Sequence, residues 1–285
     1  MINKILLADS GTGNPKEMLQ SLLELPAVAG ATVTVLHVVP TQVSMAGMAS
    51  KTEEGGKILA EAIASLSLDP SKVSTILRQG DPKDTVCEVA EEIGADLIVM
   101  GSRGLKRLEA ILENSVSQYV FQLTDRPMLL VRDDIYVKKI KRVMVALDKS
   151  AKAQLSLDLA LFLLRSSQSV ELFLTRINPD LDPRLLPLSA AEMENNPVIA
   201  SILPQVKRAG IKYRCLVTGG KPGEQLCKLA ADNNIDLLIL GSPDRRPSIA
   251  KGLPDLDRLL GSSLSDYVRV NADCPVLLAR QDADN

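Results

Sequence analysis

The stretch GDPKDTVCEVAEEIGADLIVMGS, residues 80–102, recurs in altered form as GKPGEQLCKLAADNNIDLLILGS, residues 220–242. Each stretch opens with a turn signal, continues as an amphipathic helix and closes as a short apolar run. In the first stretch Val86 and Val89 share one helical face, while Glu91 falls on the opposite face. The pattern predicts a surface helix that leads into a buried strand, twice in the same chain.

Two further matches extend the repeat over both halves of the chain. INKILLADS (2–10) matches IKRVMVALDKS (140–150), and RPMLLVR (126–132) matches CPVLLAR (274–280). A spacing this steady over several elements indicates two copies of one domain. We expect a first domain in residues 1–133, a linker in residues 134–139 and a second domain in residues 140–282.

Short apolar runs alternate with the amphipathic stretches in each copy. Residues 5–8, 33–39, 97–100 and 128–131 have the continuous apolar character of strands that are buried on both faces. Strand and helix in alternation predict an α/β fold, in which a parallel sheet carries helices on both faces. Ligands of such sheets bind at the carboxyl ends of the strands. Two longer segments, residues 42–55 and 178–196, are interpreted as mobile connections into the second helix of each copy.

The composition narrows the class of protein. The 285 residues are 46% hydrophobic and 24% charged, which suits a globular chain with two cores. A net charge of −2, with four Tyr, three Phe and no Trp, argues against a nucleic-acid partner. No apolar run approaches the ~18 residues of a membrane span, and the start lacks the pattern of a secretory signal. Four separated cysteines fit reduced thiols, so we expect a cytoplasmic protein without a membrane partner.

A carboxylate follows the first strand of each copy, Asp9 in the first and Asp148 in the second. Such a carboxylate can accept hydrogen bonds from a ribose or an adenine amine, or it can cap the following helix. The sequence leaves both interpretations open. Gly11 and Gly13 begin a G-x-G-x-x-G pattern, but Lys16 stands at the third glycine position, so the dinucleotide fingerprint fails.

A glycine-containing turn follows the fourth strand of the first copy. GSRG (101–104) is followed, after nine residues, by NSVS (114–117), which opens a helix. Glycines allow successive backbone N–H groups to converge on an anion, and a helix N-terminus adds unpaired N–H groups. Serine hydroxyls can donate to phosphate oxygens. The alternative is a pair of glycine turns with a serine cap.

On these residues the chain resembles the universal stress protein family, as a tandem two-domain member. The resemblance rests on Asp9 and Asp148, the GDP and GKP turns, and the strands ADLIVMGSRG and IDLLILGSPD. It implies two tandem, doubly wound, five-stranded parallel sheets of the Rossmann-like, adenine nucleotide alpha hydrolase-like type. It also implies that the closing strands pair, which would pack the copies as an intramolecular pseudo-dimer.

The resemblance further implies a ligand, ATP or else ADP or AMP, with Mg²⁺ on the phosphates. The ATP-binding branch of the family carries G-x-x-G, nine residues, then G-[ST]; Gly101, Gly104 and Ser115 fit, while Asn114 replaces the third glycine. Asn is the residue other than glycine that best tolerates left-handed backbone angles. The binding residues implied in the first copy are Ala8, Asp9, Ser10, Val39, Met100, Gly101, Ser102, Arg103, Gly104, Asn114, Ser115, Val116 and Ser117.

The second copy departs from this motif. Asp244 replaces the second glycine, and residues 245–260 replace the nine-residue spacer. One interpretation is a degenerate copy that binds nothing; the other is that Arg245 or Arg246 in the insertion holds the phosphates. The candidate binding residues of this copy are Asp148, Gly241, Ser242, Gly261, Ser262 and Ser263.

These expectations lead to a stress-response protein that acts as a nucleotide-dependent regulator with at most slow hydrolysis. We expect no catalytic residues and no metal ligands, because the sequence places no histidine or carboxylate pair at the predicted phosphate position; His37 is expected to be a hydrogen-bonded core residue. The alternative is a protein-interaction module that binds no nucleotide. An enzyme on a related α/β fold would need an S-G-G-x-D-S type of loop, which residues 10–13 do not match. Partner proteins stay unknown, and a homodimer is possible.

Overall fold

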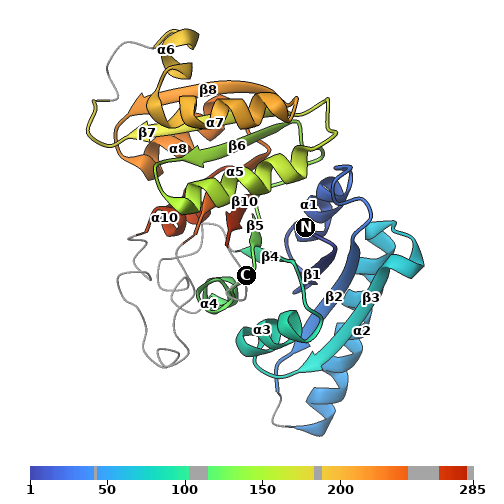
Figure 1. Cartoon of the computed structure of the whole chain (residues 1–285). Helices are drawn as coiled ribbons and strands as arrows, with labels where there is room; N and C mark the ends of the chain where they lie inside the picture. Colours follow the sequence, from blue (N-terminus) through green and yellow to red (C-terminus); the bar gives the residue numbers. More distant parts are fainter. Residues whose placement is uncertain (42–43, 103–114, 183–187, 243–262, 281–285) are drawn as a thin grey trace. The chain divides into compact units, whose positions relative to one another are not determined.

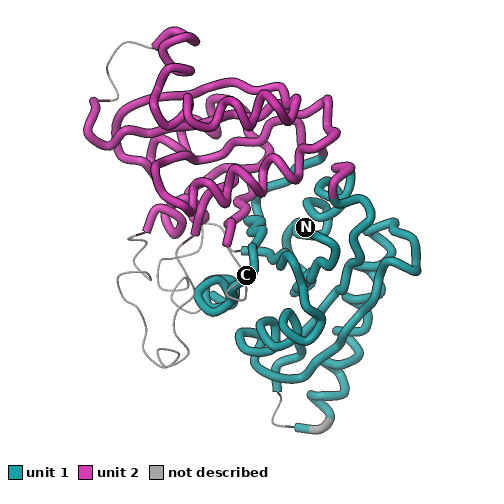
Figure 2. Tube along the Cα trace, in the orientation of Figure 1, with its two compact units in different colours: residues 1–24, 28–138, 245–254 teal, residues 25–27, 139–244, 255–285 magenta. Residues whose placement is uncertain are grey.

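The computed structural model describes residues 1–41, 44–102, 115–182, 188–242 and 263–280 (Figure 1). These residues divide into two compact units, coloured separately in Figure 2. Unit 1 holds the described residues of 1–24 and 28–138, and unit 2 holds those of 25–27 and 139–280. Each unit is an α/β domain, which confirms the predicted fold class, whereas the packing of the units as a pseudo-dimer stays a prediction.

Unit 1 is a five-stranded sheet with the strand order β3-β2-β1-β4-β5, and all four neighbouring pairs are parallel. The order reverses beside β1, so α1 and α2 contact each other on one face of the sheet and α3 and α4 contact each other on the other. The elements are β1 (Lys4–Ala8), α1 (Pro15–Leu23), β2 (Thr32–Val39), α2 (Met45–Leu66), a 3₁₀ turn (Pro70–Lys72), β3 (Val73–Gln79), α3 (Pro82–Glu92), β4 (Leu97–Ser102), α4 (Val116–Leu123) and β5 (Met128–Arg132).

Unit 2 repeats this topology with the order β8-β7-β6-β9-β10, again with parallel neighbours. It differs after its second strand, where two helices stand in place of one. The elements are β6 (Arg142–Leu147), α5 (Ala151–Leu164), β7 (Glu171–Asn178), α6 (Ala190–Glu194), α7 (Pro197–Arg208), β8 (Lys212–Gly219), α8 (Pro222–Asp232), β9 (Leu237–Gly241), α10 (Leu264–Asn271) and β10 (Val276–Ala279).

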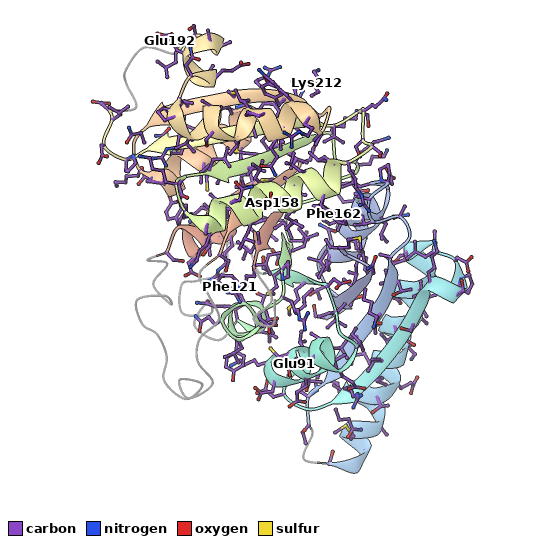
Figure 3. The ribbon with its side chains drawn as sticks, viewed as in Figure 1. Glu91, Phe121, Asp158, Phe162, Glu192 and Lys212 are labelled. Carbon is purple, nitrogen blue, oxygen red and sulfur yellow. The ribbon has the colours of Figure 1, made fainter. Side chains whose placement is uncertain are left out.

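The helices follow the amphipathic pattern of the sequence. Val86 and Val89 of α3 are buried against the sheet, whereas Glu91 is exposed on its outer side (Figure 3). The two segments expected to be mobile connections are partly helical. The first is helical from Met45 onward. The second contains α6 (Ala190–Glu194), and Ser189 caps the N-terminus of this helix in a capping box with Glu192.

The same carboxylate interaction fixes the start of the central strand in both units. In unit 1 one oxygen of Asp96, Oδ2, accepts the backbone N–H groups of Asn3 (2.7 Å) and Lys4 (2.9 Å). In unit 2 Oδ2 of Asp236 accepts those of Lys141 and Arg142, both at 2.8 Å. The loop before β4 or β9 is thereby tied to the first residues of β1 or β6, and the equivalence sets the register for comparing the two units.

Candidate functional site

A cavity of about 420 Å³ lies at the carboxyl ends of β1, β2 and β4 in unit 1; we call it cavity 1. The strand order reverses direction beside β1, which is where ligands of open α/β sheets bind. Residues of α2, of α3 and of the first turn of α4 also line it. Of the thirteen residues expected here, ten line cavity 1: Ala8, Asp9, Ser10, Val39, Met100, Gly101, Ser102, Ser115, Val116 and Ser117. The other three, Arg103, Gly104 and Asn114, lie outside the described residues.

Asp9 is the most buried charged residue at cavity 1, with 3% of its surface exposed. Its Oδ1 accepts the N–H of Gly11 at 2.8 Å, and its Oδ2 lies 3.5 Å from Nζ of Lys16. The capping interpretation is wrong, because the N-cap of α1 is Asn14. Asp9 instead holds the turn after β1, and within the described residues its Oδ2 makes no hydrogen bond.

His37 lies at the end of β2 and contributes to the same cavity. Its Nδ1 is 2.8 Å from the carbonyl oxygen of Asp9. A carbonyl oxygen can only accept, so Nδ1 carries the proton and donates it. The expected hydrogen bond is therefore present, but the ring is half-buried at the cavity wall rather than in the core.

The N-terminus of α4 forms the opposite end of cavity 1. Within the described residues, the N-cap Ser115 accepts no hydrogen bond from a helix N–H. Its hydroxyl lies instead 2.9 Å from the hydroxyl of Ser117. No described side chain therefore caps the first N–H groups of α4, and together with the two hydroxyls they offer donors to an anion.

Several residues of cavity 1 were not anticipated from the sequence. Lys51, Glu54 and Ile58 come from α2, and Asp133 follows β5. Lys51 Nζ donates to Glu54 at 2.7 Å, and this hydrogen bond lowers the pKa of the Glu54 carboxyl. The apolar spacing of α2 could have revealed a helix, but not that its side would face the strand ends.

A second cavity, of about 410 Å³, lies at the carboxyl ends of β6, β7 and β9 in unit 2; we call it cavity 2. Of the candidate residues of the second copy, Asp148, Gly241 and Ser263 line it. Ser242 does not; its buried hydroxyl accepts a hydrogen bond from Nε of Arg280 at 2.8 Å. Gly261 and Ser262, and with them Asp244, Arg245 and Arg246, lie outside the described residues.

The equivalence of Asp148 with Asp9 is wrong by one residue. Lys4 and Arg142 occupy the same place, so counting along each strand puts Ala146 at the place of Ala8 and Leu147 at the place of Asp9. Strand β6 has six residues where β1 has five. Asp148 follows the longer strand and is exposed, although its Oδ1 accepts a local N–H from Ser150 as Asp9 does from Gly11.

At cavity 2 the N-terminus of α10 is capped, and the side chain of Asp266 in the same helix takes part in the cap. Ser263 Oγ accepts the N–H of Asp266 at 3.1 Å and donates to its Oδ2 at 2.6 Å. The other oxygen of Asp266 accepts from Nε of Arg269 at 3.1 Å. A phosphate at this end would meet the Asp266 carboxylate, which α4 replaces with the neutral Gln118.

Gly241, near the carboxyl end of β9, also has different surroundings from its equivalent Gly101 in β4. A Cβ on Gly241 would lie 2.7 Å from both Cβ and the carbonyl oxygen of Lys152, so α5 packs directly on the strand. A Cβ on Gly101 would meet nothing closer than 3.7 Å. Gly241 therefore serves packing, whereas Gly101 leaves space at cavity 1.

The described residues contain neither a candidate metal-ligand cluster nor a membrane-spanning helix. No three His, Cys, Asp or Glu side chains gather as metal ligands there. In the same part of the chain, no helix combines the length and apolar character needed to cross a bilayer.

Comparison with known proteins gives consistent matches. The model of the universal stress protein family matches residues 1–132 and again residues 139–280. Universal stress protein YxiE of Bacillus subtilis is 32% identical over 148 residues, which is 46% of this chain and all of the relative. Universal stress protein Sll1654 of Synechocystis is 32% identical over 135 residues, 46% of this chain and 86% of the relative. A universal stress protein structure from Archaeoglobus fulgidus shares the fold, with a TM-score of 0.72 at 21% identity over 99% of this chain and 98% of that one.

Proposed function

The chain belongs to the universal stress protein family as a tandem of two family domains, and on this premise we propose that unit 1 binds ATP or another adenine nucleotide in cavity 1. One observation carries the proposal. A cavity at the strand ends combines an apolar floor with the N-terminus of α4, which no described side chain caps. A nucleotide likewise has a weakly polar end, its planar base, and an anionic end, its phosphates.

The base end of cavity 1 would be formed by Ala8, Val39 and Met100, with Asp9 as an acceptor for an amine or a ribose hydroxyl. The phosphate end would be formed by Gly101, Ser115 and Ser117 with the first N–H groups of α4. Arg103, Gly104 and Asn114 are expected from the motif to join them.

We propose that a nucleotide in cavity 1 carries a cation on its phosphates. Among the described residues, Lys51 pairs with Glu54 and Lys16 lies 3.5 Å from Asp9, so each of these two carboxylates already has a positive neighbour. A Mg²⁺ ion usually keeps several waters and few protein ligands, which fits a site where no trio of protein ligands gathers in the described residues. We expect nucleotide affinity to fall when Mg²⁺ is removed.

A regulatory role is proposed rather than rapid turnover. His37 is bonded through Nδ1 to the Asp9 carbonyl group, and Asp9 itself is engaged by Gly11 and Lys16. These contacts give Asp9 and the Nδ1 of His37 structural roles, and we propose that neither activates a water. Many turnovers per minute that are lost in Ser115→Ala would contradict this role. Residence in the cytosol, which the four separated cysteines of the sequence fit, stays a prediction.

The first experiment is to purify the protein without added nucleotide, denature it, and identify any released compound by chromatography and mass spectrometry. Calorimetry with Mg-ATP would follow. We expect one equivalent of nucleotide per chain. The double variant Ser115→Ala/Ser117→Ala should weaken binding about tenfold or more, because hydrogen bonds to charged groups contribute ~1.5–3 kcal/mol each.

The chain offers a matched control for this experiment. Ser265 in α10 stands where Ser117 stands in α4, and Ser265→Ala should leave Mg-ATP binding unchanged. If the purified protein is empty and fails to bind added Mg-ATP, the interaction-module alternative becomes the better description.

A further inference from the structure

The segment that follows β5 is hydrogen-bonded to the start of α1; we call residues 133–137 the strap. Nδ2 of Asn14 donates to the carbonyl oxygen of Ile135 at 2.8 Å and to that of Asp133 at 3.4 Å. One side-chain amide thus joins two carbonyl groups of a segment that lies about 120 residues further along the chain.

A second contact lies two turns further along α1. Ser21 is buried, and its Oγ donates to the carbonyl oxygen of Val137 at 2.9 Å. Ile135 and Val137 are buried as well, whereas Tyr136 between them is 63% exposed. Contacts at every second residue are those of an extended segment. All these hydrogen bonds end on main-chain carbonyl groups, so they depend on the position of the strap and not on its side chains.

Asn14 is the N-cap residue of α1, but in the described structure its side chain caps no N–H of the helix. Asn is favoured at this position because its side-chain oxygen can accept a helix N–H. Carbonyl oxygens only accept, so it is the amide nitrogen of Asn14 that must face the strap. In unit 2 the N-cap of α5 is Ser150, which accepts the N–H of Ala153 at 3.2 Å. Asn14 therefore binds the strap in place of capping its own helix.

The loop before Asn14 joins this contact to cavity 1. Ser10 and Thr12 of the loop line the cavity, and so does Asp133, the first residue of the strap. A Cβ on Gly13 would lie 3.4 Å from Cα of Asp133, so the loop and the strap approach each other closely. One side of cavity 1 is therefore built from two segments that Asn14 holds together.

This arrangement links the strap to whatever fills cavity 1. A ligand that contacts both segments binds better when the strap is docked, and it favours docking by the same free energy. Release of the strap would cost its hydrogen bonds to α1. It would also free the side chain of Asn14 to cap the helix, which offsets part of that cost. The docked and released arrangements therefore differ by less than the count of lost hydrogen bonds suggests.

We propose that the strap is a coupling element, in which Asn14 is a positioning residue and a nucleotide in cavity 1 stabilises the docked arrangement. The proposal rests on the proposed function of cavity 1 for the identity of the ligand. It adds a means of regulation, because occupation of cavity 1 would change how firmly the chain that leads to unit 2 is held.

The test is limited trypsin digestion of the full chain, because Lys138 and Lys139 directly follow the strap and are exposed. A protease needs several accessible residues on both sides of the bond that it cuts, so cleavage here measures how often the strap opens. Mass spectrometry of the fragments separates these two sites from other lysines and arginines. Calorimetry with Mg-ATP is done on the same samples.

Three variants separate the strap contact from the helix cap. Asn14→Asp keeps a side chain that can cap α1 but removes both donors to the strap. Ser21→Ala removes the second contact. Ser150→Asp is the matched control, since it makes the same kind of change at the N-cap of α5, where the side chain serves its own helix.

Without nucleotide, we expect Asn14→Asp to raise the rate of cleavage after Lys138 and Lys139 about fivefold or more, and Ser21→Ala to raise it in the same direction. Ser150→Asp should be cleaved like the wild type. Saturating Mg-ATP should slow cleavage of the wild type at these two sites about threefold or more. By reciprocity, Asn14→Asp should bind Mg-ATP more weakly than the wild type does. A residue that only supports the fold would give no dependence of cleavage on nucleotide.

Two results would overturn the proposal. The first is that Asn14→Asp is cleaved like the wild type in the absence of nucleotide. The second is that Mg-ATP binds by calorimetry but leaves the rate of cleavage unchanged. If calorimetry shows no binding of Mg-ATP, the proposed function of cavity 1 fails and its coupling to the strap fails with it. The digestion of the variants without nucleotide still decides whether Asn14 holds the strap.

Discussion

Gly55 and Gly56 are neighbours in α2 with opposite surroundings. A Cβ on Gly55 would lie 2.8 Å from Cδ1 of Leu77 and 2.9 Å from Cδ2 of His37, whereas a Cβ on Gly56 would meet nothing within 4 Å. The His37 ring cannot move freely, because Asp9 holds its Nδ1. Gly55 therefore allows α2 to approach the sheet beside cavity 1, and Gly56 has no such role.

The pair gives a prediction with its own control. Gly55→Ala should lower the free energy of unfolding by about 1–2 kcal/mol, because overpacking exceeds the gain in helix propensity. Gly56→Ala should raise it by about 0.5–1 kcal/mol, since alanine is the better helix former and no contact opposes it. Urea denaturation of both variants measures the difference. Equal effects of the two substitutions would show that α2 is not in close contact with His37.

Cys215 gives a prediction on pH. Burial, reinforced by the charge of Glu194, raises the pKa of this thiol from 9.0 to about 11. Between these values the unfolded chain releases the proton while the folded chain keeps it, so stability must fall as pH rises through this window. We expect the unfolding free energy of the wild type to fall more steeply than that of Cys215→Ala between pH 9 and 11. Parallel curves for the two proteins would contradict it.

At the residue scale, the sequence predicted which kinds of side chain follow the first strands better than it predicted their structural equivalence between the two units. It identified the carboxylates that follow the first strands, but it aligned Asp148 with Asp9. An additional residue in β6 leaves the apolar pattern of the strand intact, so nothing in the sequence reveals the shift. The main-chain bonds to Asp96 and Asp236, together with the strand pairing, establish it, and they place Leu147 at the cavity position.

At the scale of elements, α4 and α10 occupy equivalent places but end differently. Ser263 caps α10 through a hydrogen bond from Asp266, whereas Ser115 caps no N–H of α4 in the described structure. The capped helix, α10, belongs to unit 2, whose phosphate motif is altered. The helix without a described cap, α4, belongs to unit 1, whose phosphate motif is nearly complete. The state of the helix end thus separates a structural terminus from one that can receive a ligand.

Paired alanine substitutions test this separation. Ser263→Ala should lower stability by about 1 kcal/mol through the loss of a cap, and it should leave nucleotide affinity unchanged. Ser115→Ala removes the hydroxyl contact with Ser117 but no cap, so it should lower stability less than Ser263→Ala does, and it should weaken nucleotide binding. Thermal unfolding and calorimetry on both variants give the four values. A large loss of stability in Ser115→Ala would mean that Ser115 is a structural cap after all.

Element existence followed from the sequence because strands and helices alternate with clear periodicity. The start of α2 did not, since residues 45–55 contain small and polar residues that resemble a connection. That helix begins at Met45, and its side supplies Lys51 and Glu54 to cavity 1. Residues at strand ends could be assigned to a site from topology alone, whereas residues from a covering helix depend on tertiary packing.

At the scale of the whole molecule, nucleotide should affect one unit of the chain. Hydrogen exchange followed by mass spectrometry should show that Mg-ATP slows exchange in β1, in β4 and at the start of α4, because these segments line cavity 1. Exchange in β6, β9 and α10 should stay the same. Protection of both units, together with two equivalents bound, would instead support the idea that arginines of the insertion at residues 245–260 rescue the second copy.

The carboxylates of Asp96 and Asp236 bear on how such a chain can change over evolutionary time. Each makes the same two bonds to the start of its central strand, although the residues around the two cavities differ. The requirements of folding are met at the amino ends of the strands, and those of binding at the carboxyl ends. After a gene duplication, substitutions could therefore accumulate at one end of a domain without loosening the other. One copy of a duplicated domain can therefore acquire a new binding specificity while the other copy retains the original one.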